Sequence, residues 1–144
     1  MKIAYQGIPG SYSESCVKEN YHECETIACK TFDECFQLAS NDNSIKAIIP
    51  EQNQLIGNIN IEFLIFKYRL NIYSEHFFLI NHNLLTLPGT KIEDIKTVYS
   101  HTAALSQSSS FIKKHNLIEN VMADTAGSAQ FVSLTKDKSK AAIA

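Results

Sequence analysis

The turn after residues 97–99 carries residue types that can hold a small anion. This β-favouring run ends at Ser100, His101 and Thr102, and apolar residues with helical spacing follow directly. The sequence therefore predicts a strand, a tight turn and a helix. The first backbone N–H groups of a helix have no partner within it, so they form a positive pole that suits a carboxylate or phosphate. The same residues are typical of a plain helix cap, and both interpretations stay open.

A second turn of this kind lies near the end of the sequence. Residues 120–123 predict a strand, and either Asp124 or Thr125 can cap the helix that follows. Gly127 lies in the first turn of that helix. We therefore expect a second strand-to-helix anion site here.

A glycine loop follows the first predicted strand. Gly7 and Gly10 let the backbone approach a ligand closely, and Ser11 or Ser13 can cap a helix over residues 14–20. The loop lacks the third glycine of the dinucleotide fingerprint. It is equally compatible with a phosphate or carboxylate cradle and with ordinary turn chemistry.

Amide side chains gather after the short apolar strand predicted over residues 46–50. Gln52, Asn53 and Gln54 lie where open α/β sheets bind ligands, at the carboxyl end of a strand. Amides can hydrogen-bond hydroxyls and carboxylates without adding charge. Solvated loop amides are the alternative.

The elements that must position these turns alternate between strand and helix, which predicts the α/β class. A long strand over residues 71–80 is expected to cross from a first lobe to a second, so that polar turns of both lobes form a cleft for a small polyanion. The strand-favouring runs are residues 2–5, 26–29, 46–50, 71–80, 83–87, 97–99, 120–123 and 140–144. The helical segments are residues 14–20, 31–39, 59–68 and about 102–115, with a single turn at 92–95. Side chains expected in or near the core include Phe32, Cys35, Phe36, Ala39, Phe63, Leu64, Phe66 and Lys67.

Composition excludes several classes of partner. The formal net charge of −2 comes from 13 basic and 15 acidic residues spread along the chain, so no basic stripe indicates nucleic acid. The apolar runs are far shorter than the ~20 residues of a membrane span. No signal-peptide pattern is present, which favours a cytoplasmic protein. The cysteines show no metal-binding spacing and are expected to be free thiols. They are Cys16, Cys24, Cys29 and Cys35.

Four segments, in this order, resemble the prephenate dehydratases, which convert prephenate to phenylpyruvate in phenylalanine biosynthesis. They are residues 3–14, residues 84–89, residues 95–101 together with 105–107, and residues 124–129. Together the resemblance covers nearly the whole chain. It implies a two-lobed fold similar to the type II periplasmic binding proteins, with residues 1–75 in lobe 1 and 76–144 in lobe 2, and usually a homodimer.

The resemblance also implies a site for prephenate that needs no metal or organic cofactor. The reaction expels carbon dioxide and water, so an enzyme need only orient the substrate and help the hydroxyl to leave. The implied catalytic residues are Asn53, Gln107 and Thr125. The implied substrate-binding residues are Ser13, Gln52, Ser100, His101 and Gly127. Neither His82 nor His101 is predicted to be catalytic, although histidine titrates near neutral pH. His82 is expected to be a structural histidine in a strand run.

Three departures from the family pattern leave alternatives open. After Ser-His the commonest family form is Pro-Gln, where this sequence reads Thr102-Ala103. The family reads Pro-Ile-Glu-Asn-Ser where residues 50–54 read Pro-Glu-Gln-Asn-Gln, so Gln52 replaces a carboxylate. The family's Thr-Arg-Phe motif and its ACT domain are expected beyond residue 144. The sequence is therefore compatible with a dehydratase and with a non-catalytic relative that binds a small aromatic carboxylate. It does not separate prephenate from arogenate as substrate.

Overall fold

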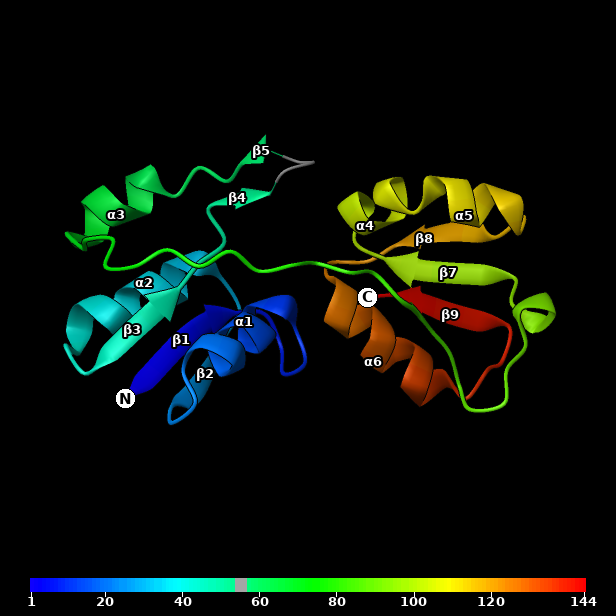
Figure 1. Ribbon diagram of the computed structural model, residues 1–144, viewed down its shortest axis with the longest axis horizontal. Coiled ribbons are helices and arrows are strands. Elements are labelled where there is room, and N and C mark those ends of the chain that lie inside the picture. Colours follow the sequence, from blue (N-terminus) through cyan, green and yellow to red (C-terminus); the bar gives the residue numbers. More distant parts are fainter. Residues whose placement is uncertain (54–56) are drawn as a thin grey trace. The chain divides into compact units, whose positions relative to one another are not determined.

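The computed structural model describes residues 1–53 and 57–144 and divides the chain into two compact units (Figure 1). Unit 1 is Met1–Leu79 and unit 2 is Ile80–Ala144. The division falls a few residues after the boundary that the sequence predicts, between 75 and 76.

Unit 1 is built on a parallel three-stranded sheet in the order β2-β1-β3. The strands are β1 (Lys2–Gln6), β2 (Glu25–Cys29) and β3 (Ile45–Ile48), and the connecting helices are α1 (Tyr12–Asn20) and α2 (Phe32–Asn41). Side chains of a strand alternate between its two faces, so β1 contributes to two cores. Ile3 and Tyr5 pack with Val17 of α1, whereas Ala4 packs with Cys35 of α2.

The rest of unit 1 is attached mainly through side chains. A short antiparallel pair, β4 (Gln52–Asn53) and β5 (Gly57–Asn58), precedes helix α3 (Glu62–Tyr68). Asp33 of α2 accepts hydrogen bonds from Lys67 Nζ at 2.6 Å and from the Tyr68 hydroxyl at 2.8 Å. These contacts hold α3 beside α2.

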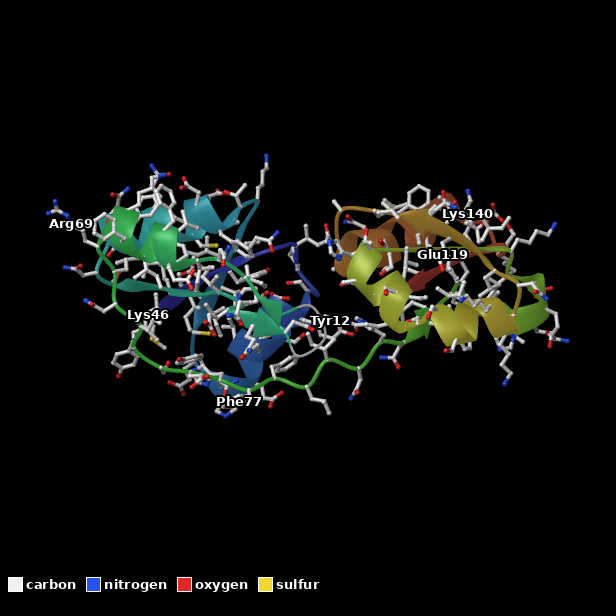
Figure 2. The ribbon with its side chains drawn as sticks, turned by 90° about the horizontal axis from the view of Figure 1, so that it is seen from above. Tyr12, Lys46, Arg69, Phe77, Glu119 and Lys140 are labelled. Atoms are coloured by element: carbon white, nitrogen blue, oxygen red, sulfur yellow. The ribbon has the colours of Figure 1, made fainter. Side chains whose placement is uncertain are left out.

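Two sequence predictions for unit 1 are wrong. Residues 71–80 form no strand, because no described strand pairs with them. Side-chain contacts attach this extended segment instead: Lys46 Nζ lies 3.8 Å from the centre of the Tyr73 ring (Lys46 is labelled in Figure 2). The predicted core residues Phe63 and Phe66 are 71% and 85% exposed, since only Ile61 at the start of α3 is buried.

Unit 2 contains a four-stranded sheet in the order β6-β9-β7-β8. Its three parallel strands are β7 (Thr97–Ser100), β8 (Ile118–Val121) and β9 (Lys140–Ile143), and β6 (Leu84–Leu85) pairs antiparallel with β9. The helices are η1 (Ile92–Asp94), α4 (Thr102–Gln107), α5 (Ser109–Lys114) and α6 (Thr125–Thr135). The core holds Ile95, Val98, Ala104, Leu105, Ile112, Leu117, Ala141 and Ile143.

The predicted helix over about 102–115 is two short helices. Ser108 leaves helical geometry at φ −98° and ψ 8°, where α4 ends and α5 begins. Serine competes for backbone hydrogen bonds and has a modest helix propensity, and four serines lie between residues 106 and 110. The break therefore has a local cause.

Candidate functional site

The glycine loop of unit 1 is held by a buried carboxylate. Glu14, in the first turn of α1, is 6% exposed, and its Oε2 accepts the Gly10 N–H at 2.7 Å. The Gly7 N–H donates to the Cys29 carbonyl at 2.9 Å. Gly7 has φ +126°, which favours glycine, and a Cβ there would lie 3.0 Å from the Ser11 hydroxyl. Loop geometry is thus fixed from both ends.

Glu14 was not singled out from the sequence. Its other oxygen, Oε1, receives Lys18 Nζ at 2.9 Å and the Thr26 hydroxyl at 3.3 Å. The hydrogen bonds from Gly10 and then from Lys18 lower the pKa of the Glu14 carboxyl. The detectable signal was a glutamate in the first helical turn, four residues after Gly10. It indicates an anchor for the loop and no exposed proton carrier.

Ser11, and not Ser13, caps α1. The Ser11 hydroxyl accepts the Glu14 N–H at 3.4 Å, whereas Ser13 lies inside the helix and is half-buried. The amide pair lies further along unit 1, on β4, with Gln52 exposed and Asn53 half-buried. Gln54, the third predicted amide, lies outside the described residues.

In unit 2, the side chain of Ser100, at the end of β7, is hydrogen-bonded to the neighbouring strand of the sheet. Ser100 is fully buried, and its hydroxyl donates to the Ile143 carbonyl of β9 at 2.5 Å. The assignment of Ser100 to substrate binding stays a prediction. In this structure its hydroxyl is already hydrogen-bonded to the backbone. His101 caps α4, because its Nδ1 accepts the Ala103 N–H at 3.2 Å. The imidazole therefore stabilises the turn at the exposed surface.

Gln107, the last residue of α4, contacts a histidine distant in sequence. Its Oε1 lies 2.9 Å from Nε2 of His82, which precedes β6. Gln107 is exposed, so its amide is open to a ligand. His82 was predicted to be a structural histidine in a strand, and the strand is absent at that position.

The amino end of α6 is capped by Asp124. Asp124 Oδ1 accepts the Gly127 N–H at 2.6 Å, and the Ser128 hydroxyl donates to the Asp124 carbonyl at 2.7 Å. A Cβ on Gly127 would lie 3.1 Å from both carboxylate oxygens, so only glycine fits this cap without a shift. Thr125 is half-buried at the first helical position. The Gly127 N–H thus already donates to Asp124. The Thr125 hydroxyl is the group at this turn that can bind a ligand.

The two turns of unit 2 lie at one edge of its sheet. β7 and β8 are parallel neighbours with Ser100 opposite Val121, and the Met122 N–H donates to the Ser100 carbonyl at 2.8 Å. Helices α4 and α6 both begin at this edge (Figure 1). Unit 2 therefore brings His101 and Thr125 to the carboxyl ends of adjacent strands, where open α/β sheets bind ligands.

Apart from His101 and Gly127, the predicted site residues have hydroxyl or amide side chains. Ser13, Gln52 and Asn53 belong to unit 1, and the remaining predicted residues belong to unit 2. Among residues 1–53 and 57–144, no cluster of acidic, histidine or cysteine side chains could hold a metal ion. The same residues include no helix that is long and apolar enough to span a membrane. Hydroxyls and amides can orient an oxygen-rich anion and donate hydrogen bonds to a leaving group.

Comparison with known proteins gives a consistent result along the whole chain. A family model described as prephenate dehydratase matches residues 3–144. "Arogenate dehydratase 2" of Petunia hybrida is 37% identical over all of this chain and 37% of its own length. "Arogenate dehydratase/prephenate dehydratase 2, chloroplastic" of Arabidopsis thaliana is 34% identical over all of this chain and 38% of its length. The chain thus spans well under half the length of these relatives.

Two solved structures are also similar. One, described as GqqA, a novel type of quorum quenching acylase, has a TM-score of 0.90 and 32% identity over all of this chain and 53% of its own. The prephenate dehydratase of Staphylococcus aureus has a TM-score of 0.76 and 24% identity over all of this chain and 54% of its own. The second likeness concerns the fold alone. The predicted α/β fold, two-lobed and similar to type II periplasmic binding proteins, is confirmed.

Proposed function

The chain belongs to the prephenate dehydratase family, and we propose that it catalyses the decarboxylating dehydration of prephenate to phenylpyruvate in phenylalanine biosynthesis. The observation that carries this proposal is the family match along residues 3–144. The hydroxyl and amide side chains among the candidate residues support it, since the reaction needs orientation more than a strong base.

The chemistry explains why hydroxyls and amides could suffice. Prephenate carries two carboxylates and a ring hydroxyl, and loss of carbon dioxide and water yields an aromatic ring. Aromatisation supplies the driving force, so the protein has to hold the pyruvyl carboxylate and stabilise the departing hydroxyl while the ring carboxylate leaves as carbon dioxide. In this proposal no metal or organic cofactor takes part.

The residues that the family resemblance implies are assigned the following roles in the proposed reaction. We assign Asn53, Gln107 and Thr125 to the reacting groups, because an amide or hydroxyl can donate to a leaving oxygen. The assigned substrate-binding residues are Ser13, Gln52, Ser100, His101 and Gly127. The Ser100 hydroxyl is hydrogen-bonded to the Ile143 carbonyl and the Gly127 N–H to Asp124. In the proposed reaction these two groups hold the turns in place for the substrate.

The test is whether the purified chain forms phenylpyruvate from prephenate. The product is measured by its ultraviolet absorption, against a blank without protein. Asn53→Ala should lower kcat/KM by roughly 10²-fold or more, the usual effect of removing a donor that acts on the reacting group. Asn60→Ala is the matched control, because Asn60 is exposed and outside the proposed site. An Asn53→Ala chain as active as the control would contradict the assignment of Asn53.

Arogenate should be assayed in parallel, because relatives of this chain are named for either substrate. Calorimetry with phenylpyruvate separates the remaining alternative. Binding without any turnover would support a non-catalytic relative of the family. The absence of both binding and turnover would refute the proposed function.

The assembly and location of the chain are further parts of the proposal. A homodimer is supported by the family resemblance and by the exposed aromatic side chains of α3, Phe63 and Phe66. Light scattering after size-exclusion chromatography would measure the mass, and a monomer at all accessible concentrations would exclude the dimer. A cytoplasmic location is proposed from the sequence pattern alone, and cell fractionation tests it.

Hydrolysis of an acyl group is a second candidate, favoured by the similarity to the acylase. In unit 1, Ser74 Oγ lies 3.2 Å from His76 Nε2, and the Tyr21 hydroxyl lies 2.8 Å from the same nitrogen. A hydroxyl beside an imidazole is the arrangement of an activated nucleophile. A serine-reactive fluorophosphonate should then label the chain and fail to label Ser74→Ala. An unlabelled chain that cleaves no nitrophenyl ester would exclude this candidate.

A further inference from the structure

We propose that His82 is a positioning residue, which orients the side-chain amide of Gln107 toward the substrate. This inference rests on the proposed function, because it assigns Gln107 a contact with prephenate. The observation behind it is the 2.9 Å contact between His82 Nε2 and Gln107 Oε1. The two residues are 25 positions apart, so tertiary structure alone creates the pair.

The chemistry of the two groups fixes the direction of this hydrogen bond. An amide oxygen has no hydrogen and can only accept, so Nε2 of His82 carries the proton and donates. With Oε1 engaged, the amide nitrogen of Gln107 projects away from the imidazole. Its two N–H groups are then available to a carboxylate or to a leaving hydroxyl. The opposite rotamer would offer the amide oxygen, which repels a carboxylate and cannot donate a hydrogen bond to the leaving hydroxyl.

Both partners are held by the backbone around them. The Asn83 N–H donates to the Ala144 carbonyl at 2.7 Å, and the Ala144 N–H donates back to the Asn83 carbonyl at 3.1 Å. This pair anchors the residue next to His82 at the end of β9. On the other side, buried Ala104 and Leu105 fix α4.

The Gln107 side chain itself has no such anchor. Gln107 is exposed, and a glutamine side chain samples many rotamers in water. The hydrogen bond from His82 selects one of them before a ligand arrives, and pre-organisation of this kind strengthens binding and catalysis. His82 thus acts on the substrate only through Gln107.

A double-mutant cycle tests this role. His82→Ala should lower kcat/KM for prephenate by about two- to tenfold, the usual worth of one neutral hydrogen bond. His82→Gln should restore most of that loss, because its amide nitrogen can donate at a similar reach. In a Gln107→Ala chain, His82→Ala should have almost no further effect. His115→Ala is the control, since the His115 ring packs on Phe111 of α5.

Nuclear magnetic resonance gives a readout that is independent of turnover. The ¹⁵N shifts of the His82 ring should show a proton on Nε2, and His82→Ala should shift the side-chain amide signals of Gln107. The Nδ1 tautomer, unshifted Gln107 signals, or additive effects in the cycle would each overturn the inference. Those results in a wild-type chain that converts prephenate would leave the proposed function intact. A wild-type chain that neither binds nor converts prephenate would refute the proposed function and this role together.

Discussion

Replacement of Glu14 by glutamine should destabilise unit 1 in a pH-dependent way. The carboxylate accepts the Gly10 N–H on one oxygen and Lys18 with Thr26 on the other. In Glu14→Gln, the amide oxygen can keep the Gly10 contact, but the amide NH₂ then faces the Lys18 ammonium. One charge-assisted hydrogen bond is lost, which is worth about 1.5–3 kcal/mol. Because Lys18 is largely exposed and water replaces its partner, we expect the lower end, about 1.5 kcal/mol.

The sign of the pH dependence follows from the pKa of Glu14. Its contacts lower this pKa in the folded chain relative to the ordinary value of 4.5. The stabilisation is therefore present in full above about pH 4.5 and is lost as the pH falls through the folded-state pKa. The difference between wild type and Glu14→Gln should be largest near neutral pH and should shrink in acid.

Amide hydrogen exchange resolved by residue is the appropriate assay, because it reports on unit 1 separately from unit 2. Glu19→Gln is the matched control, since Glu19 lies on the exposed side of the same helix. Protection of β1 and α1 should fall in Glu14→Gln and stay unchanged in the control. An equal loss at pH 7 and pH 3.5 would show that the charge of Glu14 is not the source of the stabilisation.

Three further substitutions test the described geometry by urea denaturation. Ser100→Ala should lower the free energy of unfolding by about 1 kcal/mol, because it leaves a buried carbonyl without its donor. The same change at exposed Ser106 should have a much smaller effect. Equal effects of the two changes would contradict the buried contact. Asp124→Ala should lower the free energy of unfolding by about 1 kcal/mol, because it removes the cap of α6. Asp124→Asn should retain most of the stability. An alanine variant as stable as the wild type would argue against the cap. At protein concentrations where the chain is monomeric, Phe66→Ser should change the free energy of unfolding by less than about 0.5 kcal/mol, because its side chain is 85% exposed. A loss of several kcal/mol in the monomer would show that Phe66 belongs to the core.

Local hydrogen bonding could be predicted from the sequence. Ser11 caps α1 and Asp124 caps α6 through contacts to residues three positions ahead, and each is one of the two residues that the sequence offers as that cap. Such contacts depend on a few neighbouring residues, so residue type and spacing suffice. The α/β class followed in the same way from the alternation of short strands with helices.

The errors came from segments whose structure depends on a distant partner. Residues 71–80 have strong β propensity, but a strand also needs a neighbour that completes its ladder, and no described strand supplies one. Phe63 and Phe66 follow a helical pattern that predicts burial, yet α3 contacts the sheet mainly through α2. Propensity and periodicity describe one segment and cannot say what covers it.

The sequence by itself determined the family, the helix caps and the positions of the polar turns, because these depend on residue types at short spacing. Only tertiary structure decided what each polar group contacts. It buried Ser100 against Ile143, 43 residues away, closed the glycine loop with Glu14 and paired His82 with Gln107. Hydrogen bonds between distant residues form only where packing brings their backbones together, and no local pattern records that distance.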